Sequence, residues 1–97
     1  MAGERLAVAC QPNDAGWTCE VGVGKGSGAT RHRVTVDADT LAELAPSHAA
    51  PDDLVRRSFE FLLEREPSTS ILSTFELTAI ERYFPGYRGE IRRRLES

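Results

Sequence analysis

A glycine-rich stretch, VGVGKGSGATRHRV from Val21 to Val34, is the part of the chain that most resembles a phosphate-binding loop. A P-loop requires GxxxxGK followed by Ser or Thr, and it opens a helix whose backbone amides hold the anion. Here Lys25 is followed by Gly26, and the chain continues into the strand-like segment HRVTV. A kinase-type glycine loop does lie between strands, but its catalytic apparatus needs more than 97 residues. We therefore interpret the stretch as a hairpin turn and expect no cofactor.

Two cysteines and a histidine are the residues that would suit redox or metal chemistry. Alternation of apolar and polar residues places Cys10, Cys19 and His32 on one face of the predicted strands. A disulfide between the cysteines is geometrically conceivable, whereas a metal site is less so with a single histidine nearby. We interpret the cysteines as small, reduced core residues, and His32 as a hydrogen-bonded residue at the edge of the core. No metal ligand set is predicted.

Arg65 and Glu66 occupy unusual positions on the helix predicted near them. On a helical wheel both lie on or beside the apolar sector, although Arg65 also belongs to the last turn, where a cation complements the helix dipole. An arginine drawn toward a core needs an acidic or carbonyl partner. We predict that Arg65 and Glu66 belong to a structural ion pair that braces the helix end, with Glu76 or Glu81 as the acidic partner, in preference to a ligand site.

Basic residues form two further candidate surfaces. One is the outer face of the predicted sheet, where small residues leave the backbone accessible beside forked guanidinium donors. Its candidate partner-docking residues are Gly22, Gly24, Lys25, Arg31 and Arg33. The other is the run Arg92 to Arg94, which we interpret as dipole-complementing, solvated charge that Glu90 and Glu96 partly neutralise.

Composition limits the class of protein. The chain has 40% apolar residues, 28% charged residues and a formal charge of −3, typical of a folded domain and unlike a basic nucleic-acid binder. No apolar run approaches the roughly 18 residues that span a bilayer. The start MAGERLAVAC is too short and acidic for a secretory signal. We expect a cytoplasmic protein with no membrane association.

The elements that position these residues follow from hydrophobic periodicity. Residues 1–36 predict a three-stranded antiparallel meander, in which Cys10 pairs with Cys19 and the second hairpin pairs Val23 with His32. Both registers place the apolar residues of the three strands on one inner face. With His32 at its end, this face comprises Leu6, Val8, Cys10, Cys19, Val21, Val23, His32, Val34 and Val36.

Residues 37–97 predict a helical part with three or four helices. A short helix is expected over residues 37–45, a long one from Pro51 to Pro67, and a last one whose buried stripe is Tyr87, Ile91 and Leu95. Between them we expect a short helix over residues 68–75 and a capping box, Thr78 with Glu81, that opens another. The fold class is thus α+β, with the meander packed against three or four C-terminal helices in a single domain, residues 1–97.

Two blocks of the helical part, SFEFLLEREP and ILSTFELTAIERYFPGY, resemble a family of small bacterial proteins with an SFxFLLEREP block followed by IL, a spacer and RYFPxY. The resemblance covers roughly residues 34–91 and implies an intracellular α+β protein of unassigned role. It supplies no catalytic residue to carry over.

The functional expectation is a non-enzymatic protein. The sequence has no paired-carboxylate cleft, no nucleophile with a base and no ligand cluster. The first hypothesis is a cytoplasmic protein–protein interaction or accessory module, with an unknown partner or self-association. The alternative is RNA or DNA binding through the basic second hairpin and the terminal arginines. A third and weakest hypothesis is a small-molecule or redox sensor that uses Cys10 and Cys19.

Overall fold

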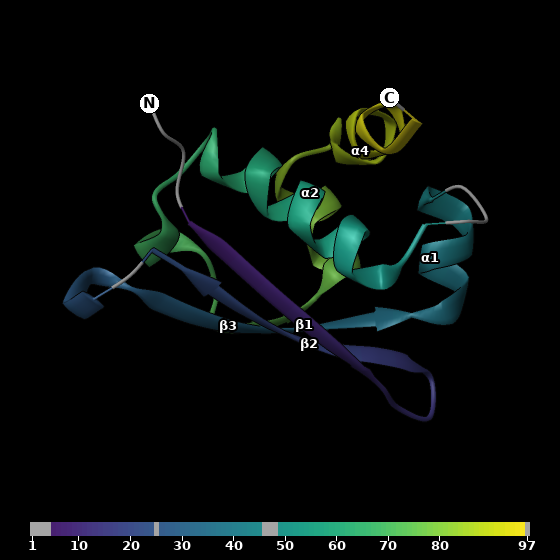
Figure 1. The fold of residues 1–97 in the computed structure, drawn as a ribbon. Coiled ribbons are helices and arrows are strands. Elements are labelled where there is room, and N and C mark those ends of the chain that lie inside the picture. Colours follow the sequence, from purple (N-terminus) through teal and green to yellow (C-terminus); the bar gives the residue numbers. More distant parts are fainter. Residues whose placement is uncertain (1–4, 25, 46–48, 97) are drawn as a thin grey trace.

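The computed structural model describes residues 5–24, 26–45 and 49–96, in which helices cover one face of a four-stranded sheet (Figure 1). The strands lie in the order β1–β2–β3–β4 and comprise β1 (Leu6–Pro12), β2 (Gly16–Val23), β3 (Thr30–Asp37) and β4 (Thr74–Glu76). The α-helices of this part are α1 (Ala38–Leu44), α2 (Pro51–Leu63), α3 (Ile80–Tyr83) and α4 (Tyr87–Glu96). Short 3-10 turns occupy Gly26–Gly28, Ser68–Ser70 and Leu77–Ala79. The predicted α+β class is confirmed.

The first hairpin has the predicted register. Cys10 pairs with Cys19 and Leu6 with Val23, and the ladder continues without a bulge to Pro12 and Trp17. The Asn13 side chain closes the turn, because its Oδ1 accepts the N–H groups of Ala15 at 2.8 Å and Gly16 at 2.7 Å. The turn chemistry visible in QPNDAG therefore sets the register that the apolar alternation requires.

The register of the second hairpin differs from the predicted one by two residues. Val23 pairs with Thr30 and Val21 with His32, so the strands pair further toward the glycine loop than expected. The chain reverses directly after Val23 because Gly24 and Gly26 adopt φ of 82° and 72°, the left-handed region that glycine enters without strain. A shift of two residues keeps every side chain on its face, so the inner face was predicted correctly.

A fourth strand replaces the helix that the sequence predicted over residues 68–75. Residues Thr74–Glu76 pair in parallel with β3, and only Ser68–Ser70 forms a 3-10 turn. The predicted capping box is also wrong, since Thr78 lies within the turn Leu77–Ala79 and α3 begins with no side-chain cap. A strand of three residues is too short to show alternation in the sequence. Its pairing with β3 is a long-range contact, which the local pattern does not reveal.

The long helix α2 packs its wide apolar face between the sheet and α4 (Figure 1). It begins at Pro51 as expected and ends at Leu63, before the predicted stop at Pro67. Phe59 is fully buried, and its ring centroid lies 5.3 Å from that of His32 on β3 and 6.1 Å from that of Phe75 on β4. The opposite side of α2 presents Phe61 to Tyr87 of α4. One hydrophobic core thus joins both layers.

Candidate functional site

The glycine-rich loop connects two antiparallel strands, and its described residues form a short 3-10 turn and begin no α-helix. Gly24 ends the first hairpin's ladder, with its N–H donating to the Arg5 carbonyl at 2.8 Å, and the turn Gly26–Gly28 leads into β3. The sequence interpretation as a turn is confirmed by this connection. Lys25, the one lysine of the chain, lies outside the described residues.

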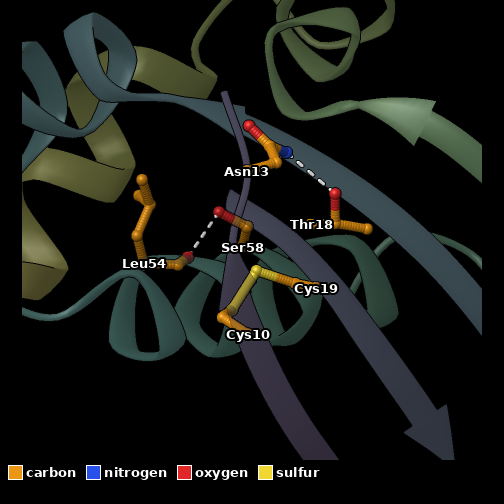
Figure 2. The surroundings of a disulfide bond; sticks show 6 residues. All are labelled: Cys10, Asn13, Thr18, Cys19, Leu54 and Ser58. Carbon is orange, nitrogen blue, oxygen red and sulfur yellow. Dashed lines mark hydrogen bonds between the residues drawn. A yellow bond between two sulfur atoms is a disulfide. The ribbon is translucent and has the colours of Figure 1, made fainter. Parts of the chain in front are cut away.

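The two cysteines form a disulfide, which corrects the prediction of reduced thiols. Cys10 and Cys19 face each other across β1 and β2 with their Cα atoms 4.0 Å apart. Figure 2 shows the bond on the side of the sheet that α2 covers, where Cys19 is fully buried. Opposed residues that are not hydrogen-bonded to each other have the shorter of the two antiparallel Cα separations, so the register itself places the two side chains directly beside each other.

His32 is a buried, hydrogen-bonded residue, as the sequence predicted. Its Nδ1 lies 2.8 Å from the Leu72 carbonyl and its Nε2 lies 2.9 Å from the Thr30 hydroxyl. A carbonyl only accepts, so Nδ1 carries the proton and donates to Leu72. His32 therefore fixes the backbone that precedes β4.

Arg65 braces the end of α2 with partners other than the predicted ones. Its Nη1 donates to the Phe61 carbonyl at 2.9 Å and lies 3.3 Å from Glu64 Oε1, while the guanidinium carbon lies 3.7 Å from the Phe61 ring centroid. Glu64 also accepts from Arg94 of α4 at 2.7 Å. Within the described ranges, Glu66, Glu76 and Glu81 are not its ion-pair partners. Arg65 lies just after the end of α2, and an arginine at this position can reach back to donate to the last carbonyls of the helix.

The outer face of the sheet carries a hollow and, beside it, an ion pair. Gly22 and Arg31 line a shallow hollow of about 270 Å³ together with Ala7 and Ala9. Arg33 Nε, in contrast, lies 2.7 Å from Glu20 Oε2, and both side chains are exposed. The predicted docking residues Gly22 and Arg31 thus come together, whereas Arg33 is engaged by a carboxylate of the same face.

A second surface, which the sequence did not predict, lies at the C-terminal end of α2. The two large apolar side chains that are most exposed in the described part are Leu72, at 53%, and Tyr83, at 69%. Both line one hollow of about 180 Å³, whose floor includes Leu62, Ile71 and Phe84. We call this hollow with its rim the apolar groove.

A second hollow adjoins the apolar groove. Tyr83 and Phe84 also line a neighbouring hollow of about 260 Å³ that includes Arg65 and Pro85. The rings of Phe84 and Phe61 pack edge to face, with centroids 5.9 Å apart. The blocks LEREP and RYFP therefore meet as one structural unit, and part of that unit is surface.

Charge differs between the two hollows. Glu66 lines the first and has no ion-pair partner among the residues described. The second is bordered by Glu90, whose pKa is lowered chiefly by the hydrogen bonds from Arg94 and Arg93. The first hollow thus combines an apolar floor with the acidic side chain of Glu66 at its margin.

The sequence missed this surface because its two exposed residues come from segments without regular periodicity. Leu72 lies in the connection before β4, and Tyr83 ends a four-residue helix. Tyr87, which the sequence placed in the buried stripe of the last helix, is buried, with its hydroxyl 2.6 Å from Ser58 Oγ.

No group of three or more His, Cys, Asp or Glu side chains in the described ranges is arranged to hold a metal ion. The helices of the same ranges include none with the length and apolarity to cross a membrane.

Comparison of the chain with protein-family models, with curated proteins and with solved structures found no match. The family resemblance carried by LEREP and RYFP stays a prediction.

Proposed function

We propose that the chain is a small, non-enzymatic protein-binding module whose docking site is the apolar groove. The observation that carries this proposal is that Leu72 and Tyr83, the two strongly exposed large apolar side chains of the described ranges, flank the same apolar hollow. Contiguous apolar surface around a concave site is typical of interfaces, and tyrosine is among the residues that contribute most binding energy there.

The chemistry of the groove favours one kind of partner. Its volume of about 180 Å³ suits a single bulky apolar side chain. Glu66 at the margin supplies a carboxylate that would otherwise remain partly buried without an opposite charge. The partner we propose is a protein segment that presents a Leu, Ile, Phe or Met side chain next to a Lys or Arg.

A peptide-display selection on the immobilised full-length chain tests this proposal. We expect the selected peptides to share an apolar residue beside a basic one. The variant L72S/Y83S should bind them at least about tenfold more weakly, the effect of losing a hot spot of more than roughly 1.4 kcal/mol. Both side chains point to solvent, so the fold should be unchanged.

The matched control is R31A, which changes an exposed residue of the sheet's outer face. It should bind the selected peptides as the natural chain does. Glu66→Gln should weaken binding and reduce its salt dependence, because the charge pair is lost while the shape is kept. Equal binding by L72S/Y83S and the natural chain would refute the groove as the docking site.

Nucleic-acid binding remains the alternative function, but the structure offers it less support. Arg33 is paired with Glu20, and Arg94 is paired with Glu64 and Glu90. These carboxylates would have to be displaced before the arginines could neutralise phosphates. A gel-shift assay with mixed RNA and DNA at low salt tests it, since phosphate contacts are strongest there.

Localisation in the cytoplasm is part of the same proposal. Cytoplasmic thiol pools keep most cysteines reduced, so persistence of the bond between Cys10 and Cys19 there would depend on the burial of Cys19. Fractionation of cells that express a tagged chain, with thiol alkylation before lysis, would give both the compartment and the oxidation state.

A further inference from the structure

The edge of β1 is a long, open strand edge. β1 is the first strand of the sheet and runs for seven residues, whereas β4 at the opposite edge has three. Proteins protect such edges with charged residues, bulges, internal prolines or very short strands. From Leu6 to Gln11, β1 carries no charge and no proline, and its ladder with β2 has no bulge.

The hydrogen bonds show which backbone groups of β1 face outward. The N–H of Gly24 donates to the Arg5 carbonyl, and the N–H of Asn13 donates to the Gly16 carbonyl, both at 2.8 Å. Odd-numbered residues therefore bond across to β2, and the even-numbered ones direct their N–H and C=O groups away from it. The 4.0 Å separation between the Cα atoms of Cys10 and Cys19 agrees with this alternation.

The open stretch is bounded at both ends. Pro12 has no N–H to donate at one end. At the other, Arg56 Nη1 of α2 donates to the outward carbonyl of Leu6 at 3.1 Å. What remains open is a stretch centred on Val8, with Leu6 and Cys10 on either side.

We propose that β1 pairs antiparallel with β1 of a second copy of the chain, about a two-fold axis at Val8. In this register Val8 pairs with Val8, and Leu6 pairs with Cys10 of the other copy, so each outward donor meets an acceptor. The backbone N–H of Leu6 would donate to the carbonyl of Cys10 in the second copy, and the N–H of that Cys10 would donate to the Leu6 carbonyl. An isologous interface of this kind closes as a dimer.

The side chains of both faces suit a second copy. Leu6, Val8 and Cys10 are only half-buried, whereas Val21 of β2 and Val34 of β3 on the same inner face are buried. The two-fold axis would continue this row of apolar side chains into the second copy. On the outer face, Ala7 lies opposite Ala9 of the second copy. Arg5 lies opposite Gln11, so no like charges face each other across the junction.

The test uses exposed alanines whose replacement leaves the fold intact. Ala7 and Ala9 are exposed, so in the variant A7K/A9K lysines oppose lysines only if the proposed pairing forms. The natural chain should be a dimer in sedimentation equilibrium, and A7K/A9K should shift to monomer. The variant A29K/A42K makes the same chemical change at exposed residues away from β1 and should stay dimeric.

Charge reversal tests the register itself. The variant A7E/A9E should also be monomeric alone, and mixing it with A7K/A9K should restore a dimer that contains one copy of each. A natural chain that stays monomeric up to its solubility limit would overturn the proposal, as would an A7K/A9K variant that remains dimeric. The groove variant L72S/Y83S should keep the dimer, so failure of the groove and failure of the edge are separable.

Discussion

Gly16 is a position where the backbone leaves no room for a side chain. A Cβ built there would lie 2.1 Å from the Val36 carbonyl oxygen and 2.7 Å from the Ala38 nitrogen. These are backbone atoms of β3 and the start of α1, so neither can rotate away. Gly16 thus fixes how closely the first turn approaches the junction between sheet and helices.

We expect Gly16→Ala to destabilise the protein by more than about 3 kcal/mol, because a clash with backbone forces a strand or the turn to shift. Gly22→Ala is the matched control, since a Cβ there meets nothing within 4 Å. Urea unfolding followed by circular dichroism would measure both variants. Equal midpoints would show that the turn accommodates the methyl group.

Tyr87 is the residue whose ionisation the fold opposes most clearly. Burial raises the pKa of its hydroxyl well above the ordinary value of 10, and the hydrogen bond with Ser58 opposes this shift only in part. Ser58 donates its own proton to the Leu54 carbonyl at 2.7 Å, so the Tyr87 hydroxyl is the donor toward Ser58.

A raised folded-state pKa means that stability is complete below the unfolded pKa of about 10 and falls as pH rises above it. We expect the urea midpoint of the natural chain to drop between neutral pH and about pH 11. Tyr87→Phe should lose most of this alkaline dependence, at a cost of about 1 kcal/mol at neutral pH for the missing hydrogen bond. An unchanged alkaline slope in Tyr87→Phe would assign it to another group.

At the scale of elements, Arg88 ties three helices together. Its Nη1 lies 3.0 Å from Glu43 of α1, and its Nη2 lies 3.1 Å from Glu81 of α3. The pKa of Glu81 is lowered from the ordinary value of 4.5, chiefly by the hydrogen bonds from Arg88. These groups are partly exposed, so each pair contributes little alone.

A lowered folded-state pKa means that this contribution is present above the unfolded pKa of about 4.5 and is lost as pH falls through the folded value. Arg88→Ala should therefore raise the pKa of Glu81 toward 4.5, which NMR titration of the Glu81 carboxyl carbon would measure. Arg92→Ala removes an exposed arginine of the same helix and should leave that titration unchanged.

At the scale of the whole molecule, the disulfide holds β1 to the rest of the sheet. The bond closes a loop of sequence separation 9. By the chain-entropy relation, a loop of this size contributes about 2–3 kcal/mol. β1 also supplies the open edge, so loss of the bond affects the strand on which the proposed dimer depends.

We expect a reducing agent to lower the melting temperature of the oxidised protein by roughly 10 °C or more, from about 2–3 kcal/mol in a domain of this size. The variant C10A/C19A should melt at the lower temperature with or without reductant. Thiol titration of the unreduced chain in denaturant provides the direct check, and two reactive thiols per chain would contradict the disulfide.

The sequence by itself determined the local features of this protein. Alternation fixed the inner face of the three N-terminal strands, QPNDAG fixed the first turn, and Pro51 fixed the start of α2. These features depend on neighbouring residues and on a period of two or 3.6, which a single sequence displays directly.

The tertiary structure decided the features that depend on contacts between distant segments. Examples are the parallel pairing of β4 with β3, the ion pair of Glu64 with Arg94, and the hydrogen bond between the hydroxyls of Tyr87 and Ser58. The apolar groove belongs to the same class, since Leu72 and Tyr83 meet only after the chain has folded over the end of α2. No periodicity records such a meeting, because neither residue belongs to an element long enough to have a face.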